Sequence, residues 1–202
     1  MQRGADPPRA VTLVELVIVM VVSGILFVAT PPLLFHGVKT MVFLPKALAV
    51  NNVATEVLHQ MIEGDFSTLP GQTTVRGLRF AVRRSATEPA LWLTQSDSVG
   101  FLTSENQCVF IRLVGGVIKR SVSMSLPCAT QCNPAPCATE EDIPYHVAGS
   151  VQITTPSPFS YYNPGTGIRR VDIAFTAQTG SGNFDQGDAR EDITSSVAIR
   201  AP

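Results

Sequence analysis

The chain has few charged side chains for its length. Its 202 residues include 16 Asp and Glu and 15 Lys and Arg, which gives a formal net charge of −1 without a long run of either sign. Proteins that bind nucleic acid or an acidic membrane surface through charge usually carry a basic patch or segment. We therefore expect no nucleic-acid partner.

Residues that perform catalysis or bind metals are also scarce. The three histidines, His36, His59 and His146, lie far apart in the sequence. The chain has no G-x-S-x-G motif, no phosphate-binding glycine loop and no nucleophile that the pattern places beside a histidine. We therefore do not expect this protein to be an enzyme.

An apolar run near the N-terminus is long enough to cross a membrane. No Asp, Glu, Lys or Arg lies between Leu16 and His36. The 20 residues from Leu16 to Phe35 match the number that spans a hydrocarbon core. A secretory signal peptide has a shorter apolar region, of about 7–15 residues, and Val28–Thr30 resembles its cleavage site poorly. The sequence therefore predicts a retained single-span anchor.

A second apolar pattern follows the run, with the spacing of a helix. Apolar residues from Val50 to Phe66 recur at intervals of three and four, which indicates one buried helical face. We expect a single long helix with an apolar first half, residues 11–36, and an amphipathic second half, residues 37–68.

Three prolines lie inside this expected helix. They are Pro31, Pro32 and Pro45. Proline removes a backbone hydrogen bond and usually kinks a helix. The sequence therefore predicts a bent helix, with the kink at Pro31 and Pro32.

Short segments rich in β-branched and aromatic residues occupy the rest of the chain, residues 69–202. Turn signals separate them, and two glycines between Val114 and Val117 are typical of a tight hairpin. The sequence predicts an α+β fold in which the long helix packs on an antiparallel sheet. The expected strands are residues 77–84, 90–95, 108–114, 116–124, 145–154, 168–177 and 193–201.

All four cysteines follow the apolar run, and three of them lie in a Pro-rich loop at residues 125–144. An even number of cysteines in an exported-looking segment suggests two disulfides and an oxidising compartment. Their spacing, without a second pair or a histidine nearby, does not favour a zinc site. Three connectivities remain open for Cys108, Cys128, Cys132 and Cys137.

An acidic, Gly-rich loop is expected at residues 178–192. Its carboxylates are those of Asp185, Asp188, Glu191 and Asp192. Calcium binds such oxygens, although the spacing is not that of an EF-hand and a solvated acidic loop is the alternative. Calcium is the one cofactor that we consider for this chain.

One carboxylate, Glu15, lies at the start of the apolar run. Residues 12–15, Thr-Leu-Val-Glu, fit the T-x-x-E capping box, in which Thr12 and Glu15 satisfy the first free amides of a helix. This interpretation does not explain the short polar leader with two prolines, residues 1–10. An ionisable group at a membrane-spanning segment is also a functional candidate.

Residues 9–35 resemble the N-terminal region of the type IV pilin-like family, the subunits of type IV pili and of type II secretion pseudopili. That family has a polar leader, a small residue at a cleavage site, and a hydrophobic helix whose fifth residue is glutamate. The segment A-VTLVELVIVMVVSGIL matches with Ala10 at the cut, Val11 as the new N-terminus and Glu15 as the fifth residue. Pro32 lies where many pilins carry a kinking proline. Ala10 and Val11 depart from the usual Gly and Phe.

The resemblance implies cleavage after Ala10 by a prepilin peptidase and methylation of the Val11 amine. It also implies that the Glu15 carboxylate pairs with the Val11 amine of a neighbouring subunit, since pairing offsets the cost of burying both charges. Thr12 would belong to the same assembly region. Other pilin-like subunits, the peptidase and an inner-membrane assembly platform are the implied partners.

The implied location is the inner membrane, with a periplasmic C-terminal domain, and later a pilus or pseudopilus. Accessory subunits of this family, the J-type pseudopilins and W-type minor pilins, are similar in layout. The sequence leaves open whether the filament is a pilus or a secretion pseudopilus. The alternative function is a single-span, membrane-anchored periplasmic binding or adhesion domain that does not polymerise.

Overall fold

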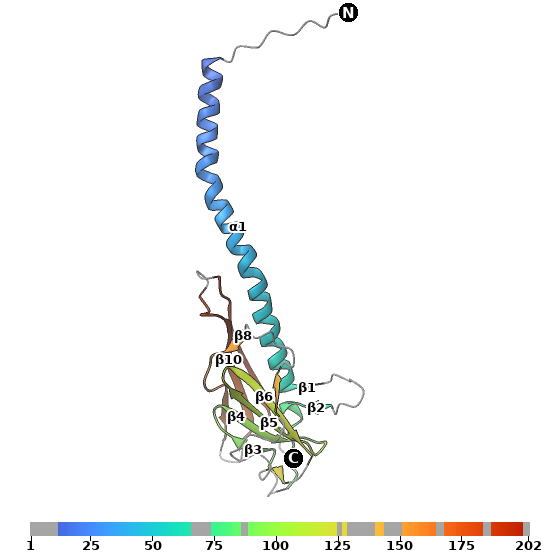
Figure 1. Cartoon of the computed structure of the whole chain (residues 1–202). Coiled ribbons are helices and arrows are strands. Elements are labelled where there is room, and N and C mark those ends of the chain that lie inside the picture. Colours follow the sequence, from blue (N-terminus) through green and yellow to red (C-terminus); the bar gives the residue numbers. More distant parts are fainter. Residues whose placement is uncertain are drawn as a thin grey trace, which may run out of the picture. The chain divides into compact units, whose positions relative to one another are not determined.

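The computed structural model describes residues 12–65, 74–85, 89–124, 127–128, 140–143, 151–164, 168–183 and 187–199. The chain divides into two compact units, Met1–Val42 and Phe43–Pro202. One helix, α1 (Leu13–Ile62), contributes to both units (Figure 1). The expected long N-terminal helix followed by antiparallel strands is confirmed.

Helix α1 runs from Leu13 to Ile62 and therefore includes all three prolines of the expected helix, Pro31, Pro32 and Pro45. It ends a few residues before the expected end at residue 68. Gly64 follows with a φ of 100°, a conformation that glycine adopts readily and that does not continue a right-handed helix. The chain then enters a short strand, β1 (Gly64–Asp65), which pairs with β2 (Val75–Arg76).

A five-stranded antiparallel sheet forms the first large layer of the second unit. Its strands, in the order β3-β4-β5-β6-β7, are β3 (Leu91–Thr94), β4 (Ser98–Leu102), β5 (Cys108–Val114), β6 (Val117–Ser123) and β7 (Glu141–Ile143). Strands β5 and β6 form the predicted hairpin, in which Gly115 and Gly116 have φ values of 60° and 82°. Two successive positive φ values define the type I′ turn that matches the twist of paired strands.

A second antiparallel sheet has β10 (Arg170–Thr179) at its centre. Strand β11 (Arg190–Ala198) lies along one side of it, and β8 (Val151–Ile153) and β9 (Phe159–Tyr162) pair with the other side. Residues of β10 alternate between buried and more exposed positions, so one face of this sheet contributes to the core.

The two sheets are joined by hydrogen bonds along one side. The Phe159 amide donates to the Ser96 carbonyl at 3.0 Å, and the Ile153 amide donates to the Gly116 carbonyl at 2.8 Å. The Tyr161 hydroxyl lies 2.9 Å from the carbonyl oxygens of both Gln95 and Ser98. Strands β8 and β9 are therefore fixed to turns of the five-stranded sheet.

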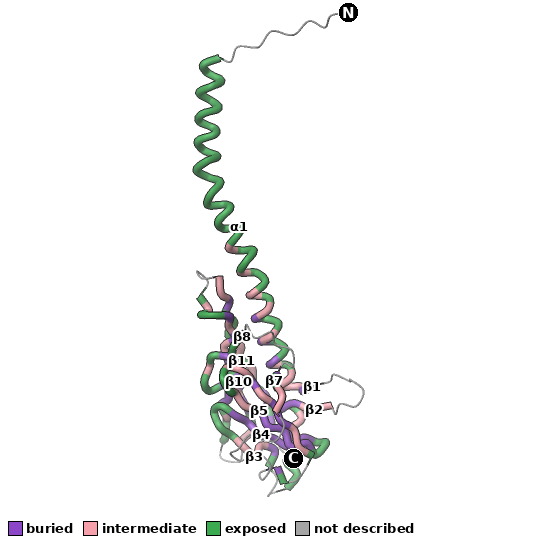
Figure 2. Tube along the Cα trace, in the orientation of Figure 1, coloured by how far each residue is buried: buried purple, intermediate pink, exposed green. Residues whose placement is uncertain are grey.

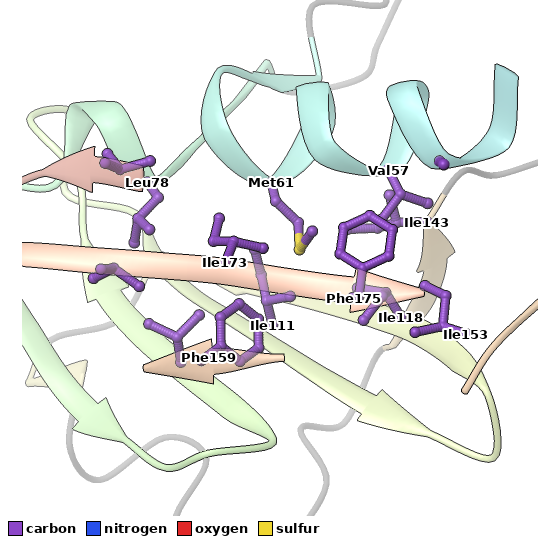
Figure 3. Close-up of a cluster of buried hydrophobic side chains, with 14 of the residues drawn as sticks. Val57, Met61, Leu78, Ile111, Ile118, Ile143, Ile153, Phe159, Ile173 and Phe175 are labelled. Atoms are coloured by element: carbon purple, nitrogen blue, oxygen red, sulfur yellow. The ribbon is translucent and has the colours of Figure 1, made fainter. Parts of the chain in front are cut away.

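The core of the second unit lies between α1 and the two sheets. Val50, Ala54, Val57 and Met61 of α1 are at most 1% exposed and repeat at helical spacing, as the sequence predicts. Figure 3 shows Val57 and Met61 pointing from the helix towards Ile173 and Phe175 of β10. The amphipathic half of the helix is therefore one wall of the core.

Several strands differ from the expected ones. Residues 77–84 contain a 3-10 turn, η1 (Leu78–Phe80), where a strand was expected, because Leu78 turns into the core and the Arg79 guanidinium pairs with Glu63 at 2.7 Å. Strands β4, β7 and β9 lie outside the expected strands. The last strand begins at Arg190, so the preceding loop is shorter than expected.

Candidate functional site

The first part of α1 exposes apolar side chains around its whole circumference. Every residue from Thr12 to Val38 is exposed (Figure 2), and the Phe27 side chain is 84% exposed. The helix is long and apolar enough to cross a membrane. Each exposed apolar Å² costs about 25 cal/mol in water, so an apolar environment would stabilise this segment. The other large apolar residues exposed here include Leu16, Val17, Ile18, Met20, Ile25, Leu26, Leu33, Leu34 and Phe35.

Three polar side chains in and just after this segment have partners on the helix itself. The Thr30 hydroxyl donates to the Leu26 carbonyl at 2.6 Å, and the Thr40 hydroxyl donates to the His36 carbonyl at 2.9 Å. The Lys39 ammonium lies 5.0 Å from the centre of the Phe35 ring. Hydrogen-bonded hydroxyls are compatible with an apolar environment, because their hydrogen-bonding groups are satisfied locally.

Thr12 and Glu15 form a capping box at the start of α1. The Thr12 amide and hydroxyl donate to Glu15 Oε2 at 2.9 and 3.0 Å, and the Glu15 amide donates to Thr12 Oγ1 at 3.3 Å. Both Thr12 donors reach the same carboxylate oxygen. Within the described part of the chain no donor binds Oε1 of Glu15, which is exposed. The cap therefore uses one oxygen and leaves the other for an external donor.

The cleavage and pairing that the resemblance implies cannot be located here. Ala10 and Val11 lie outside the described residues. Cleavage after Ala10, methylation of Val11 and the pairing of Glu15 with a neighbouring Val11 amine therefore stay predictions.

The acidic residues near the C-terminus are held by separate partners. Asp188 pairs with the Lys46 ammonium of α1 at 3.0 Å and accepts hydrogen bonds from the Ser181 amide and hydroxyl. Asp192 accepts from the Thr176 hydroxyl at 2.6 Å and pairs with Arg190 at 3.1 Å. The Lys46 hydrogen bond, first, and the Ser181 bonds lower the pKa of Asp188.

The positions of these acidic residues test in part whether they could bind calcium together. Glu191 and Asp192 belong to β11, where they alternate between the two faces of a strand, and Asp185 lies outside the described residues. Among the residues that the structure describes, no three His, Cys, Asp or Glu side chains lie close enough to hold a metal. With Asp185 not described, calcium binding stays a prediction.

One of the two expected disulfides is present. Cys108 of β5 is bonded to Cys128, with 5.3 Å between their Cα atoms. Cys132 and Cys137 lie outside the described residues. Both bonded cysteines are buried, and with Leu102 they form a small cluster against Trp92, whose ring stacks on Phe110 at 5.9 Å. The disulfide thereby fixes the start of the Pro-rich loop to the five-stranded sheet.

A group of ion pairs that the sequence analysis did not identify holds β7. Each of three consecutive carboxylates forms an ion pair with one cation of β5 or β6. The side chain of the central cation, Arg120, is only 4% exposed and also pairs with Asp65. The sequence does not show the strand pairing that aligns these charges. From the sequence alone, residues 140–142 are therefore recognisable only as an acidic run. The pairs are Glu140 with Arg112, Glu141 with Arg120, and Asp142 with Lys119.

The fold and the exposed helix together define a class of protein: an α+β domain preceded by one long apolar helix suited to a membrane or to other apolar helices. Comparison with protein-family models, with curated proteins and with solved structures found no match to this chain. The architecture is compatible with a pilin-like fold. The resemblance itself still rests on residues 9–35.

Proposed function

We propose that this chain is a minor pilin or pseudopilin, a structural subunit of a type IV pilus or type II secretion filament. It is cleaved after Ala10 and assembles through the first part of α1. The observation that carries this proposal is the exposed apolar surface from Leu13 to Val38 with one carboxylate, Glu15, at its beginning. A bilayer surrounds this surface before assembly, and the apolar helices of sister subunits surround it afterwards.

The charge at Glu15 gives the assembly its register. Cleavage creates a free α-amine at Val11, and α-amines in water have an ordinary pKa of about 8. In an apolar filament core, the Glu15 carboxylate would pair with the Val11 amine of a neighbour, because an unpaired buried charge is strongly unfavourable. Oε1, which the cap leaves without a donor in the described chain, is the oxygen that we assign to this contact.

This function gives the chain a location and partners. It is made in the inner membrane with the second unit in the periplasm, where the Cys108–Cys128 disulfide suits the oxidising environment. It then enters a pilus or pseudopilus with other pilin-like subunits, after contact with the prepilin peptidase and the assembly platform. Methylation of Val11 follows cleavage.

The second candidate function is an anchored periplasmic binding or adhesion domain that does not polymerise. The capping box favours it, because Thr12 and Glu15 already have a complete role in starting the helix. The two functions differ in what they require of the Glu15 charge. A cap requires only an acceptor oxygen, whereas a buried pair requires a carboxylate.

Glu15→Gln separates these requirements. Gln serves in a capping box as Glu does, so the variant keeps the cap and removes the charge. We expect it to reach the membrane with a folded domain and to be missing from sheared filaments. Glu56→Gln is the matched control, since Glu56 is exposed on the same helix and accepts a hydrogen bond from Gln60 at 2.6 Å. Incorporation of Glu15→Gln at the control level would favour the anchored domain.

Intact mass and N-terminal sequencing of protein from native membranes or sheared filaments test the processing step directly. A chain that begins with Val11, especially a methylated one, supports the proposal. A chain that still begins at Met1, in cells whose other prepilins are cleaved, would count against it and leave Glu15 as a helix cap.

A further inference from the structure

Two backbone carbonyls near the middle of the apolar run lack the donors that a helix normally supplies. In an α-helix, each amide donates to the carbonyl four positions before it. Pro31 and Pro32 lie within α1 and have no amide hydrogen. The carbonyls of Phe27 and Val28 therefore receive no such bond, because of the covalent structure of proline and whatever the arrangement of the other residues.

Other amides of the helix do not replace these donors. A carbonyl can also accept from the amide three or five positions ahead, as in 3-10 and π turns. For Phe27, the residue five positions ahead is Pro32. For Val28, the residue three positions ahead is Pro31. The remaining amides at these distances are the regular helical donors of neighbouring carbonyls.

The position of these carbonyls makes the missing bonds unfavourable. They lie near the midpoint of the run Leu16–Phe35, the part of a span that is deepest in hydrocarbon. Membrane helices that contain proline satisfy the freed carbonyls through hydroxyl side chains or neighbouring helices. Phe27 and Val28 are 84% and 77% exposed, so a neighbouring helix can reach this part of α1. A donor on such a helix would therefore stabilise the segment.

The run itself contains one hydroxyl that is available to another chain. Thr30 donates to the Leu26 carbonyl at 2.6 Å. Ser23 has no hydrogen-bond partner among the residues that the structure describes. A helical serine reaches carbonyls three or four positions before it, so Ser23 cannot bond to Phe27 of its own chain. A Cβ added to the adjacent Gly24 would meet no atom within 4 Å, so a second helix backbone can approach closely.

A second copy of this chain would bring that hydroxyl to the open carbonyls. The membrane gives all copies the same orientation, so two copies lie parallel. One row on the surface of α1 has members at intervals of four: Glu15, Val19, Ser23 and Phe27. A copy displaced along this row by four residues, about 6 Å, has its Ser23 beside Phe27. The same displacement brings its Val11 beside Glu15, the pair proposed above.

We propose that the Ser23 hydroxyl of a second copy donates to the carbonyl of Phe27 or Val28 that the prolines leave without a donor. The Glu15 pair sets the displacement of the two copies at the start of the helix, and this contact sets the same displacement in its middle. The choice of a displaced second copy rests on the proposed function, whereas the missing helical donors do not.

Photocrosslinking measures this displacement directly. The full chain carries p-benzoylphenylalanine at position 27 and is irradiated in native cells, and the crosslinked products are purified and sequenced. We expect dimers of this chain whose link maps to residues 22–24 of the second copy. A link to residue 27 of the second copy, or products with lipid or other proteins alone, would overturn the proposal.

Substitutions of Ser23 and the two prolines test the chemistry of the contact. Ser23→Ala removes the donor and should lower the ratio of crosslinked dimer to monomer by about three- to tenfold, the range for hydrogen bonds between membrane helices. Ser23→Thr keeps a hydroxyl and should restore the ratio. Pro31→Ala with Pro32→Ala returns the helical donors, so Ser23→Ala should have no further effect in that chain. An equal effect of Ser23→Ala with and without the prolines would refute the proposal.

N-terminal sequencing of the same samples separates this inference from the proposed function. Chains that begin at Val11 and enter filaments without the expected link would overturn the inference and leave the filament subunit intact. A chain that still begins at Met1 but links position 27 to Ser23 of a second copy would support the contact without the filament.

Discussion

Replacing Met61 by alanine tests whether the second half of α1 is a wall of the core. Met61 is 1% exposed, and its side chain points from the helix towards β10 (Figure 3). The substitution removes three heavy atoms beyond Cβ, about 0.8 kcal/mol each for transfer out of water. A residual cavity adds to this loss, and large-to-alanine changes at buried sites cost about 2–5 kcal/mol. We expect a loss of roughly 3 kcal/mol in the free energy of unfolding.

Thermal unfolding of the full chain in detergent, followed by Trp92 fluorescence, measures this loss. Trp92 is the single tryptophan and lies in β3, so its signal reports on the sheet rather than on the helix. For a unit of this size, roughly 3 kcal/mol corresponds to a decrease in Tm of about 6–12 °C.

Leu48→Ala is the control for the Met61 experiment. Leu48 lies on the same helix, is 54% exposed and leaves no core cavity when truncated. Its Tm is expected to change by no more than about 1 °C, because surface substitutions usually stay within about 0.5 kcal/mol. Equal decreases for the two variants, or no decrease for Met61→Ala, would refute the packing of α1 on the sheets.

Three further measurements test other parts of the second unit. Peptide mapping without reduction is expected to recover Cys108 linked to Cys128, and a different partner for Cys108 would contradict the fold around the Pro-rich loop. Gly100→Ala places a Cβ 2.6 Å from the Trp92 ring, so we expect a shifted emission maximum and a loss of about 1–3 kcal/mol; an unchanged spectrum would contradict this contact. The pKa of Asp188 is lowered in the folded chain, so its contribution to stability is present at neutral pH and is lost as the pH falls below the ordinary value of about 3.9. Asp188→Asn should therefore lower Tm at pH 7, and this deficit should become smaller as the pH falls below about 3.9; a deficit that does not change with pH would exclude the charge as the cause.

The sequence was most informative where a structural rule acts over neighbouring residues. The buried face of α1 from Val50 to Met61 follows helical spacing, and Gly115 and Gly116 specify the β5–β6 turn by themselves. The capping box of Thr12 and Glu15 is likewise a local pattern, and its hydrogen bonds form as expected.

Features that depend on distant partners were missed or misread. Strand β4 is buried at all five positions, so it lacks the alternation that marks a strand with one solvent-facing side. The acidic residues of β7 suit a strand only because Lys119 and Arg120 lie opposite them on β6. Residues 77–84 alternate like a strand, but the buried Leu78 belongs to a 3-10 turn.

In the candidate site, too, local patterns were predictable from the sequence and contacts between distant residues were not. The apolar run and Glu15 were recognisable because one continuous segment contains them. The partner of Asp188 could not be predicted, because Lys46 lies 142 positions away and reaches it only through the packing of α1 on the sheets.

The boundary between the two compact units falls within α1, between Val42 and Phe43, and this affects how the second unit can be produced alone. A chain cut at this boundary begins in the middle of a helical turn, where Phe43, Leu44 and Pro45 offer no side chain that can accept from the freed amides. Lys46, the anchor of Asp188, would then lie in the frayed first turn. Adding a serine or aspartate immediately before Phe43 would supply the missing acceptor, and such a shortened form is expected to melt higher than one without it.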